Sequence, residues 1–175
     1  LDRDPYIAAR EMCDKHVVKM IVESAQMLST CHRMLDGTSE RRDSVSGKRK
    51  VDYYKLDNWR ESHLYKAVHF KHPCNIWLRE STANYNWLYN HFLGLLSEYR
   101  WRYDKDHACE KLVHALSVTP TNLVDKPLTT FAQAMPDECK DTDIVQAYRK
   151  YYTKYKSEFA TWKNRATPIW FKTTS

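Results

Sequence analysis

Glycine is scarce in this sequence, at 3 of 175 residues, and no glycine-rich loop, P-loop or Gly-x-Ser-x-Gly segment is present. Such segments cradle phosphates or expose a nucleophilic serine, so their absence argues against nucleotide hydrolysis and hydride transfer. The same scarcity, together with 42% apolar and 13% aromatic residues, favours packed helices over a turn-rich β sandwich.

Paired cysteines are also missing. The 5 cysteines are odd in number, widely spread, and form no Cys-x-x-Cys pair. A secreted disulfide scaffold or a zinc ribbon is therefore not expected, and a reducing cytoplasm, or the host cytoplasm for a viral protein, fits best. The 8 histidines form no His-Glu-x-x-His, His-x-His or Glu-x-x-His pattern, so we expect no metal and no other cofactor.

Long apolar runs are absent as well. No stretch approaches the roughly 18 residues that cross a bilayer, and the start does not resemble a signal peptide, so we expect no membrane partner. The chain begins with Leu1 and not with Met, so we expect either preceding native residues or a processed start. What the sequence does have is a net charge of +6, which favours an anionic partner such as nucleic acid.

The spacing of apolar residues predicts helices and no strands. We expect an all-α fold, a compact single domain over residues 1–175 built as a bundle of three to four helices with an extended Pro-containing segment and an aromatic C-terminal tail. Residues 36–52 are predicted to be a flexible basic loop, and residues 118–137 an extended segment. The predicted helices cover about 4–35, 74–103, 107–116 and 143–163. The oligomeric state is left open.

A polar stripe follows the first predicted helix. Apolar residues flank the stripe, so part of it is expected in a cleft or beneath another helix, where a polar group needs a partner or a task. There a carboxylate can gain a raised pKa and an amine a lowered one, which suits proton transfer near neutral pH. The alternative is an amphipathic helix in which His16 and Glu23 only hydrogen-bond to a neighbouring helix. The stripe consists of Cys13, His16, Lys19, Glu23, Gln26 and Thr30, at steps of three or four residues.

Basic and aromatic residues alternate near the end of the sequence, in 148–152 and 154–156. Cations contact phosphates and flat rings stack on bases, so this mixture is typical of a nucleic-acid surface. A helix with aromatics inside and cations outside has the same pattern, and this alternative stays open. The candidate DNA-binding residues from this region and from the basic loop are Arg41, Arg42, Lys48, Arg49, Lys50, Arg149 and Lys150.

Four short motifs occur in order along the chain. They are Asp14-Lys15-His16 with Glu23 on the first helix, the aromatic helix of 77–103, Met135-Pro136-Asp137-Glu138 before the last helix, and Pro168-Ile169-Trp170-Phe171-Lys172. In this order they resemble the phage-type pyrimidine-dimer DNA glycosylase/AP-lyase family, which has a compact all-α fold. The resemblance implies that the partner is double-stranded DNA carrying a photodimer or another modified base.

The resemblance also implies roles for single residues. In that family a backbone amine at the chain start attacks C1′ of the damaged nucleotide and forms a Schiff base. Glu23 would stabilise charge and move protons, and His16 would orient that carboxylate or contact a phosphate. Leu1 stands where the family has a small hydroxyl residue, so Lys15 and Lys19 are the alternative nucleophiles. The tail residues expected to lie against the DNA are Trp170, Phe171 and Lys172.

Two other functions remain open on the sequence. A non-catalytic nucleic-acid-binding accessory protein would use the basic loop and the aromatic helix, and its salt-sensitive binding would survive Glu23→Gln. A helical protein-interaction factor of viral origin would instead present its basic surface to an acidic protein, and it would bind no DNA at moderate salt.

Overall fold

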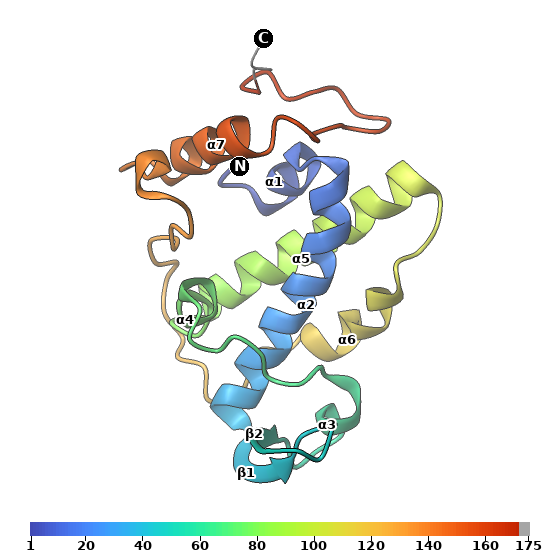
Figure 1. The fold of residues 1–175 in the computed structure, drawn as a ribbon, viewed down its shortest axis with the longest axis vertical. Coiled ribbons are helices and arrows are strands. Elements are labelled where there is room, and N and C mark those ends of the chain that lie inside the picture. Colours follow the sequence, from blue (N-terminus) through green and yellow to red (C-terminus); the bar gives the residue numbers. More distant parts are fainter. Residues whose placement is uncertain (172–175) are drawn as a thin grey trace.

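Two long helices, α2 (Asp14–Asp36) and α5 (Thr82–Tyr103), cross near the centre of the molecule (Figure 1). The computed structural model describes residues 1–171. The other elements are α1 (Pro5–Glu11), β1 (Thr38–Asp43), β2 (Lys50–Lys55), α3 (Arg60–His63), α4 (Pro73–Leu78), η1 (Ala108–Leu112), α6 (Val113–Leu116), η2 (Asp137–Cys139) and α7 (Ile144–Tyr155). The main core joins the inner faces of α2 and α5 and includes Val17, Ile21, Ala25, Leu28, Tyr85, Leu88, Phe92 and Leu95.

The predicted all-α bundle of three to four helices is wrong. Residues 1–171 contain seven α-helices and one antiparallel two-stranded sheet, so the fold is mixed. The sheet occupies most of the predicted flexible loop 36–52, with Thr38 opposite Lys55 and Asp43 opposite Lys50. Its strands are rich in charged residues and β1 is almost entirely exposed, so it lacks the apolar alternation that reveals a strand in a sequence.

The two long predicted helices are each interrupted. Between α1 and α2, Met12 and Cys13 take extended backbone conformations. The N–H of Cys13 donates to the Tyr152 hydroxyl, and the carbonyl of Met12 accepts from Arg102, so tertiary contacts replace helical hydrogen bonds. Between α4 and α5 the side chain of Ser81 caps the start of α5. Neither break contains a proline or a glycine, so the sequence carried no helix-breaking signal at these positions.

The last predicted helix is shorter than expected. It ends at Tyr155, and the following segment turns back over the start of α2, where the Asp14 N–H donates to the carbonyl of Thr161 at 2.8 Å. Residues 118–136 form no helix or strand. They are tied to the start of α5 by Asn84, whose amide oxygen accepts from the Thr129 N–H. None of the helices in residues 1–171 has the length and hydropathy needed to cross a membrane.

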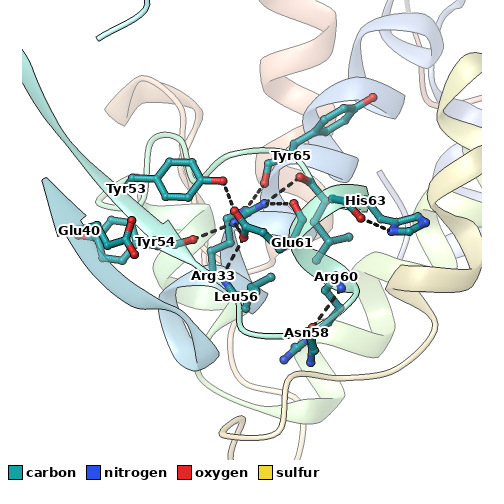
Figure 2. A network of polar contacts seen from close by, with 12 residues as sticks. Arg33, Glu40, Tyr53, Tyr54, Leu56, Asn58, Arg60, Glu61, His63 and Tyr65 are labelled. Atoms are coloured by element: carbon teal, nitrogen blue, oxygen red, sulfur yellow. Dashed lines mark hydrogen bonds and ion pairs between the residues drawn. The ribbon is translucent and has the colours of Figure 1, made fainter. Parts of the chain in front are cut away.

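Arg33 fastens the hairpin of β1 and β2 to α2. It is only 1% exposed, and its guanidinium donates to the carbonyls of Tyr54 and Tyr65 (Figure 2). It also pairs with the Glu61 carboxylate at 2.6 Å, and Glu61 in turn accepts from the Tyr53 hydroxyl. A buried cation that lost these partners would be strongly destabilising, so this network fixes where the hairpin lies.

Candidate functional site

Three lysines surround His16 near the start of α2, and we call them the lysine cluster. Lys15 and Lys19 lie on α2 itself, and Lys156 follows α7. Burial is the main cause that lowers the pKa of His16 to about 4, and the charges of the three lysines lower it further. The imidazole is therefore neutral at physiological pH. Lys19 pairs with a carboxylate, whereas Lys15 and Lys156 have no acidic partner within salt-bridge distance in residues 1–171. Their charges are free for an anionic ligand.

An aromatic ring forms one wall of this cluster. The ring centre of Phe159 lies 4.8 Å from the Lys15 Nζ and 5.7 Å from the centre of the His16 ring. Phe159 is held there because the segment after it is bound to the start of α2: the Asp14 carboxylate accepts from the Thr161 hydroxyl at 2.9 Å. Asp14 of the Asp-x-His motif therefore has a structural role, because it holds the segment 159–161 beside Lys15 and His16.

Glu23 lies two helical turns beyond His16 on the same face of α2. Its carboxylate is 3.6 Å from the Nζ of Lys19, which is exposed, whereas Glu23 is partly buried. Glu23 also adds to the raised pKa of Cys74, which is caused mainly by burial. Met20 and Met27, about one turn before and one turn after Glu23 on α2, line a cavity together with Cys74, so Glu23 lies on the face of α2 next to that cavity without lining it.

The cavity has a volume of about 170 Å³. Its wall is aromatic, with the ring of Phe131 4.8 Å from those of both Trp77 and Trp87. Tyr148 of α7 closes one side, and burial raises the pKa of its hydroxyl. The volume is below the roughly 300–1,000 Å³ typical of sites for drug-sized ligands, so the cavity suits one small flat group. Other lining residues are Leu1, Met20, Met27 and His91.

The two candidate DNA-binding residues of α7 already have partners within the protein. The Arg149 Nε donates to the carbonyl of Leu1 at 3.0 Å, and its guanidinium lies 3.8 Å from Glu11. Lys150 pairs with Asp141 at 2.5 Å. Contact of Arg149 or Lys150 with DNA would compete with these partners, and it stays a prediction.

The hairpin residues lie far from the lysine cluster. Helix α2 rises about 1.5 Å per residue, and Asp36 follows Glu23 by 13 residues, which places the hairpin end of α2 about 20 Å from Glu23. In the turn, Lys48 and Arg49 have no acidic partner in the part of the chain that the structure describes. The other three candidate cations pair within the hairpin, as Arg41 with Asp52 at 2.8 Å, Arg42 with Glu40 at 2.9 Å and Lys50 with Asp43 at 2.7 Å.

The aromatic tail packs against the protein. Phe171 is buried beside Trp162, at 4.8 Å between ring centres. Trp170 is half-buried, and its ring lies 5.4 Å from the Arg149 guanidinium. Lys172 lies outside the described residues. The expected contact of Trp170, Phe171 and Lys172 with DNA therefore stays a prediction.

The sequence did not predict that Lys156 belongs to the lysine cluster or that Phe159 packs beside it. The alternation of lysine and tyrosine in 154–156 was a usable signal. It could not be placed, because a helix predicted to run to residue 163 gave no reason for the chain to turn back onto α2. The cavity was missed too, since its wall comes from α2, α4, α5, α7 and the extended segment, which are distant in the sequence.

Within residues 1–171, no group of three or more His, Cys, Asp or Glu side chains is placed to hold a metal ion. Comparisons with protein-family models, with curated proteins and with solved structures found no match to this chain. The site is therefore interpreted from its own chemistry.

Proposed function

We propose that this protein is a DNA glycosylase/AP lyase that acts on a damaged or modified base in duplex DNA. The observation that carries the proposal is the pair of Lys19 and Glu23 on α2, where Glu23 lies between the cavity-lining Met20 and Met27, beside the unpaired ammonium groups of Lys15 and Lys156. The resemblance of Asp14-Lys15-His16 and Glu23 to the glycosylase/lyase motif supports the same reaction class.

The lysine cluster binds the DNA backbone. Lys15 and Lys156 contact phosphates next to the damaged nucleotide and displace counterions from them. His16 is neutral, so it can accept a hydrogen bond as well as donate one. The damaged base leaves the stack and enters the aromatic cavity, at an unstacking cost of a few kcal/mol that is lowest for a damaged base.

The amine and the carboxylate carry the covalent step. The nitrogen of Lys19 bonds to C1′ while the bond from C1′ to the base breaks, and the base leaves with the electron pair and takes up a proton. Glu23 receives the proton that the amine releases. The C1′–O4′ bond then breaks, O4′ takes the proton from Glu23, and the opened sugar is left as a protonated C1′=N imine, which borohydride reduces to a stable amine.

Borohydride trapping tests this proposal. The protein is incubated with duplexes that carry either a photodimer or an abasic site, and borohydride is added. We expect a covalent protein–DNA adduct that is lost in Lys19→Ala, and strand cleavage that falls by about 10²–10⁴ in Glu23→Gln. Lys111→Ala, which removes an exposed lysine on η1, is the matched control and should keep full activity.

The other outcomes separate the remaining functions. An adduct that persists in Lys19→Ala and maps to the peptide containing Leu1 would give the nucleophile's role to an amine at the chain start, as in the family that the chain resembles. Salt-sensitive DNA binding without any adduct would overturn the lyase and favour the accessory DNA-binding protein. No DNA binding at moderate salt would favour the protein-interaction factor.

A further inference from the structure

A second basic surface lies at the opposite end of α2 from the lysine cluster, in a groove between the hairpin and residues 66–68. Its volume is about 980 Å³, and Tyr53 and Tyr54 line it. Lys48 and Arg49 contribute from the hairpin turn, and Lys66 contributes from the facing segment. We call this surface the hairpin groove. It is built on the two-stranded sheet, which the resemblance to an all-α family does not predict.

The hairpin groove carries free positive charge. Lys48, Arg49 and Lys66 have no carboxylate within salt-bridge distance among residues 1–171, in contrast to Arg41, which pairs with Asp52. The same groove offers flat rings beside the cations. The two tyrosines are half-buried, and cations beside tyrosine side chains are a chemistry that contacts a sugar–phosphate backbone.

The hairpin groove and the lysine cluster lie along one face of α2. His16, Glu23 and Thr30 are spaced by seven residues, which is close to two full helical turns, so their side chains project in nearly the same direction. The Thr30 hydroxyl accepts from the N–H of Val68 at 3.1 Å, and Val68 lines the groove. The near edge of the groove therefore continues the row formed by His16 and Glu23. In Figure 1, α2 runs from the end of the molecule that carries α7 to the end that carries the hairpin.

The hairpin is held rigidly enough to present a defined surface. The buried Arg33 binds the carbonyl of Tyr54 at 2.8 Å, and Tyr53 is bound through Glu61 (Figure 2). Arg42 stacks 3.6 Å from the centre of the Tyr53 ring on the outer side. Both tyrosines of the groove are thus fixed before any partner arrives, which lowers the entropic cost of binding.

We propose that the hairpin groove binds the backbone of the same duplex whose damaged nucleotide is held at the lysine cluster; this inference rests on the proposed function. His16 and Thr30 are 14 residues apart, and at about 1.5 Å per residue this is about 21 Å along α2. Phosphates of one strand are spaced about 3.4 Å along the duplex axis, so the groove meets the backbone about six base pairs or more from the damaged nucleotide.

Binding to duplexes of two lengths tests this inference. One duplex has about four base pairs on each side of the abasic site, and the other has about twelve, so that only the second reaches the groove. The double variant Lys48→Ala/Arg49→Ala should bind the long duplex roughly tenfold more weakly than the unmodified protein, and its salt slope should fall by about 0.9 per lost contact. On the short duplex the two proteins should bind equally.

The control double variant is Lys105→Ala/Lys111→Ala, which removes the same charge from exposed positions after α5 and on η1. It should leave the affinity for both duplexes nearly unchanged. Equal affinity of the hairpin variant and the unmodified protein for the long duplex would overturn the inference, as would an equal loss on both lengths. Adduct formation is measured in parallel on the short duplex. If the unmodified protein forms no adduct but the hairpin variant still binds only the long duplex more weakly, the lyase reaction is overturned and the inference about the hairpin groove stands.

Discussion

The buried arginines near the hairpin end of α2 and the lysines around His16 at its other end differ in whether their charges are paired. At the hairpin end, the buried Arg33 pairs with Glu61 at 2.6 Å, and Arg60 pairs with Asp36 at 2.8 Å. At the other end, Lys15 and Lys156 crowd around His16 without any acidic partner among residues 1–171. The buried, paired cations hold segments of the fold together, whereas the lysines around His16 are the cations to which the proposed function assigns the DNA backbone.

The same contrast also occurs within one end of α2. Arg102 is fully buried near the start of α2, where it binds Asp14 at 3.0 Å and Glu98 at 3.0 Å. Glu98 also pairs with Arg165 of the returning segment at 2.8 Å. A structural cation and an unpartnered lysine cluster therefore occur within a few residues of each other, and only the partners of each charge distinguish them.

The largest expected effect is on the buried, partnered cation. Arg33→Ala leaves Glu61 and several carbonyls without their donor, so we expect the free energy of unfolding to fall by about 3–5 kcal/mol. Urea unfolding monitored by circular dichroism measures this. Arg41→Ala, which breaks an exposed pair in the same hairpin, should cost about 1 kcal/mol or less. Equal small losses in the two variants would mean that the Arg33 network does not hold the hairpin.

The next effect is a loss of stability in mild acid. His32 hydrogen-bonds to Tyr85 at 2.8 Å, and burial, followed by the charge of Arg60, lowers the pKa of His32 to about 4. Burial likewise lowers the pKa values of His16 and His91 to about 4. Below pH 6.5 the unfolded chain binds protons that the folded chain does not, so this stability is complete above pH 6.5 and is lost as the pH falls toward 4. The slope approaches 1.4 kcal/mol per pH unit for each histidine.

Urea midpoints measured between pH 7 and pH 5 check this effect. The carboxylates whose pKa is lowered, Asp36 and Glu61, stay ionised in this window and do not contribute to the slope. The variant His32→Asn lacks one of the titrating groups. Its free energy of unfolding should therefore depend less steeply on pH, even if its stability at pH 7 is lower. An unchanged slope would contradict the contribution of His32 to the acid sensitivity.

The smallest expected effect on stability comes from the unpartnered lysines. Lys156→Ala removes no salt bridge, so the free energy of unfolding should change by less than about 0.5 kcal/mol. The pKa of His16 should rise, because one of the charges that lower it is gone. NMR titration of the imidazole measures this rise, and the affinity for duplex DNA should fall in the same variant. A large loss of stability in Lys156→Ala would show that this lysine is structural after all.

The sequence predicted local features better than the contacts between distant segments. The apolar spacing of α2 and α5 indicated both helices, since each has one face in the core. The hairpin was missed because its exposed charged strands have no apolar alternation and are fixed by Arg33, a residue on another element. The polar stripe located His16, Lys19 and Glu23, but Lys156 joins them only because Asp14 binds the segment near Thr161.

The most direct test is to digest the borohydride-trapped adduct and identify the peptide that carries the DNA. The abasic-site duplex is used, because it forms the imine without a preceding base-release step. We predict that the adduct lies on the peptide of α2 that contains Lys19, and that Glu23→Gln reduces its rate of formation while Lys111→Ala does not. Adducts spread over the exposed lysines of the hairpin and α7, with no dependence on Glu23, would contradict the assignment of the reaction site to Lys19 and Glu23.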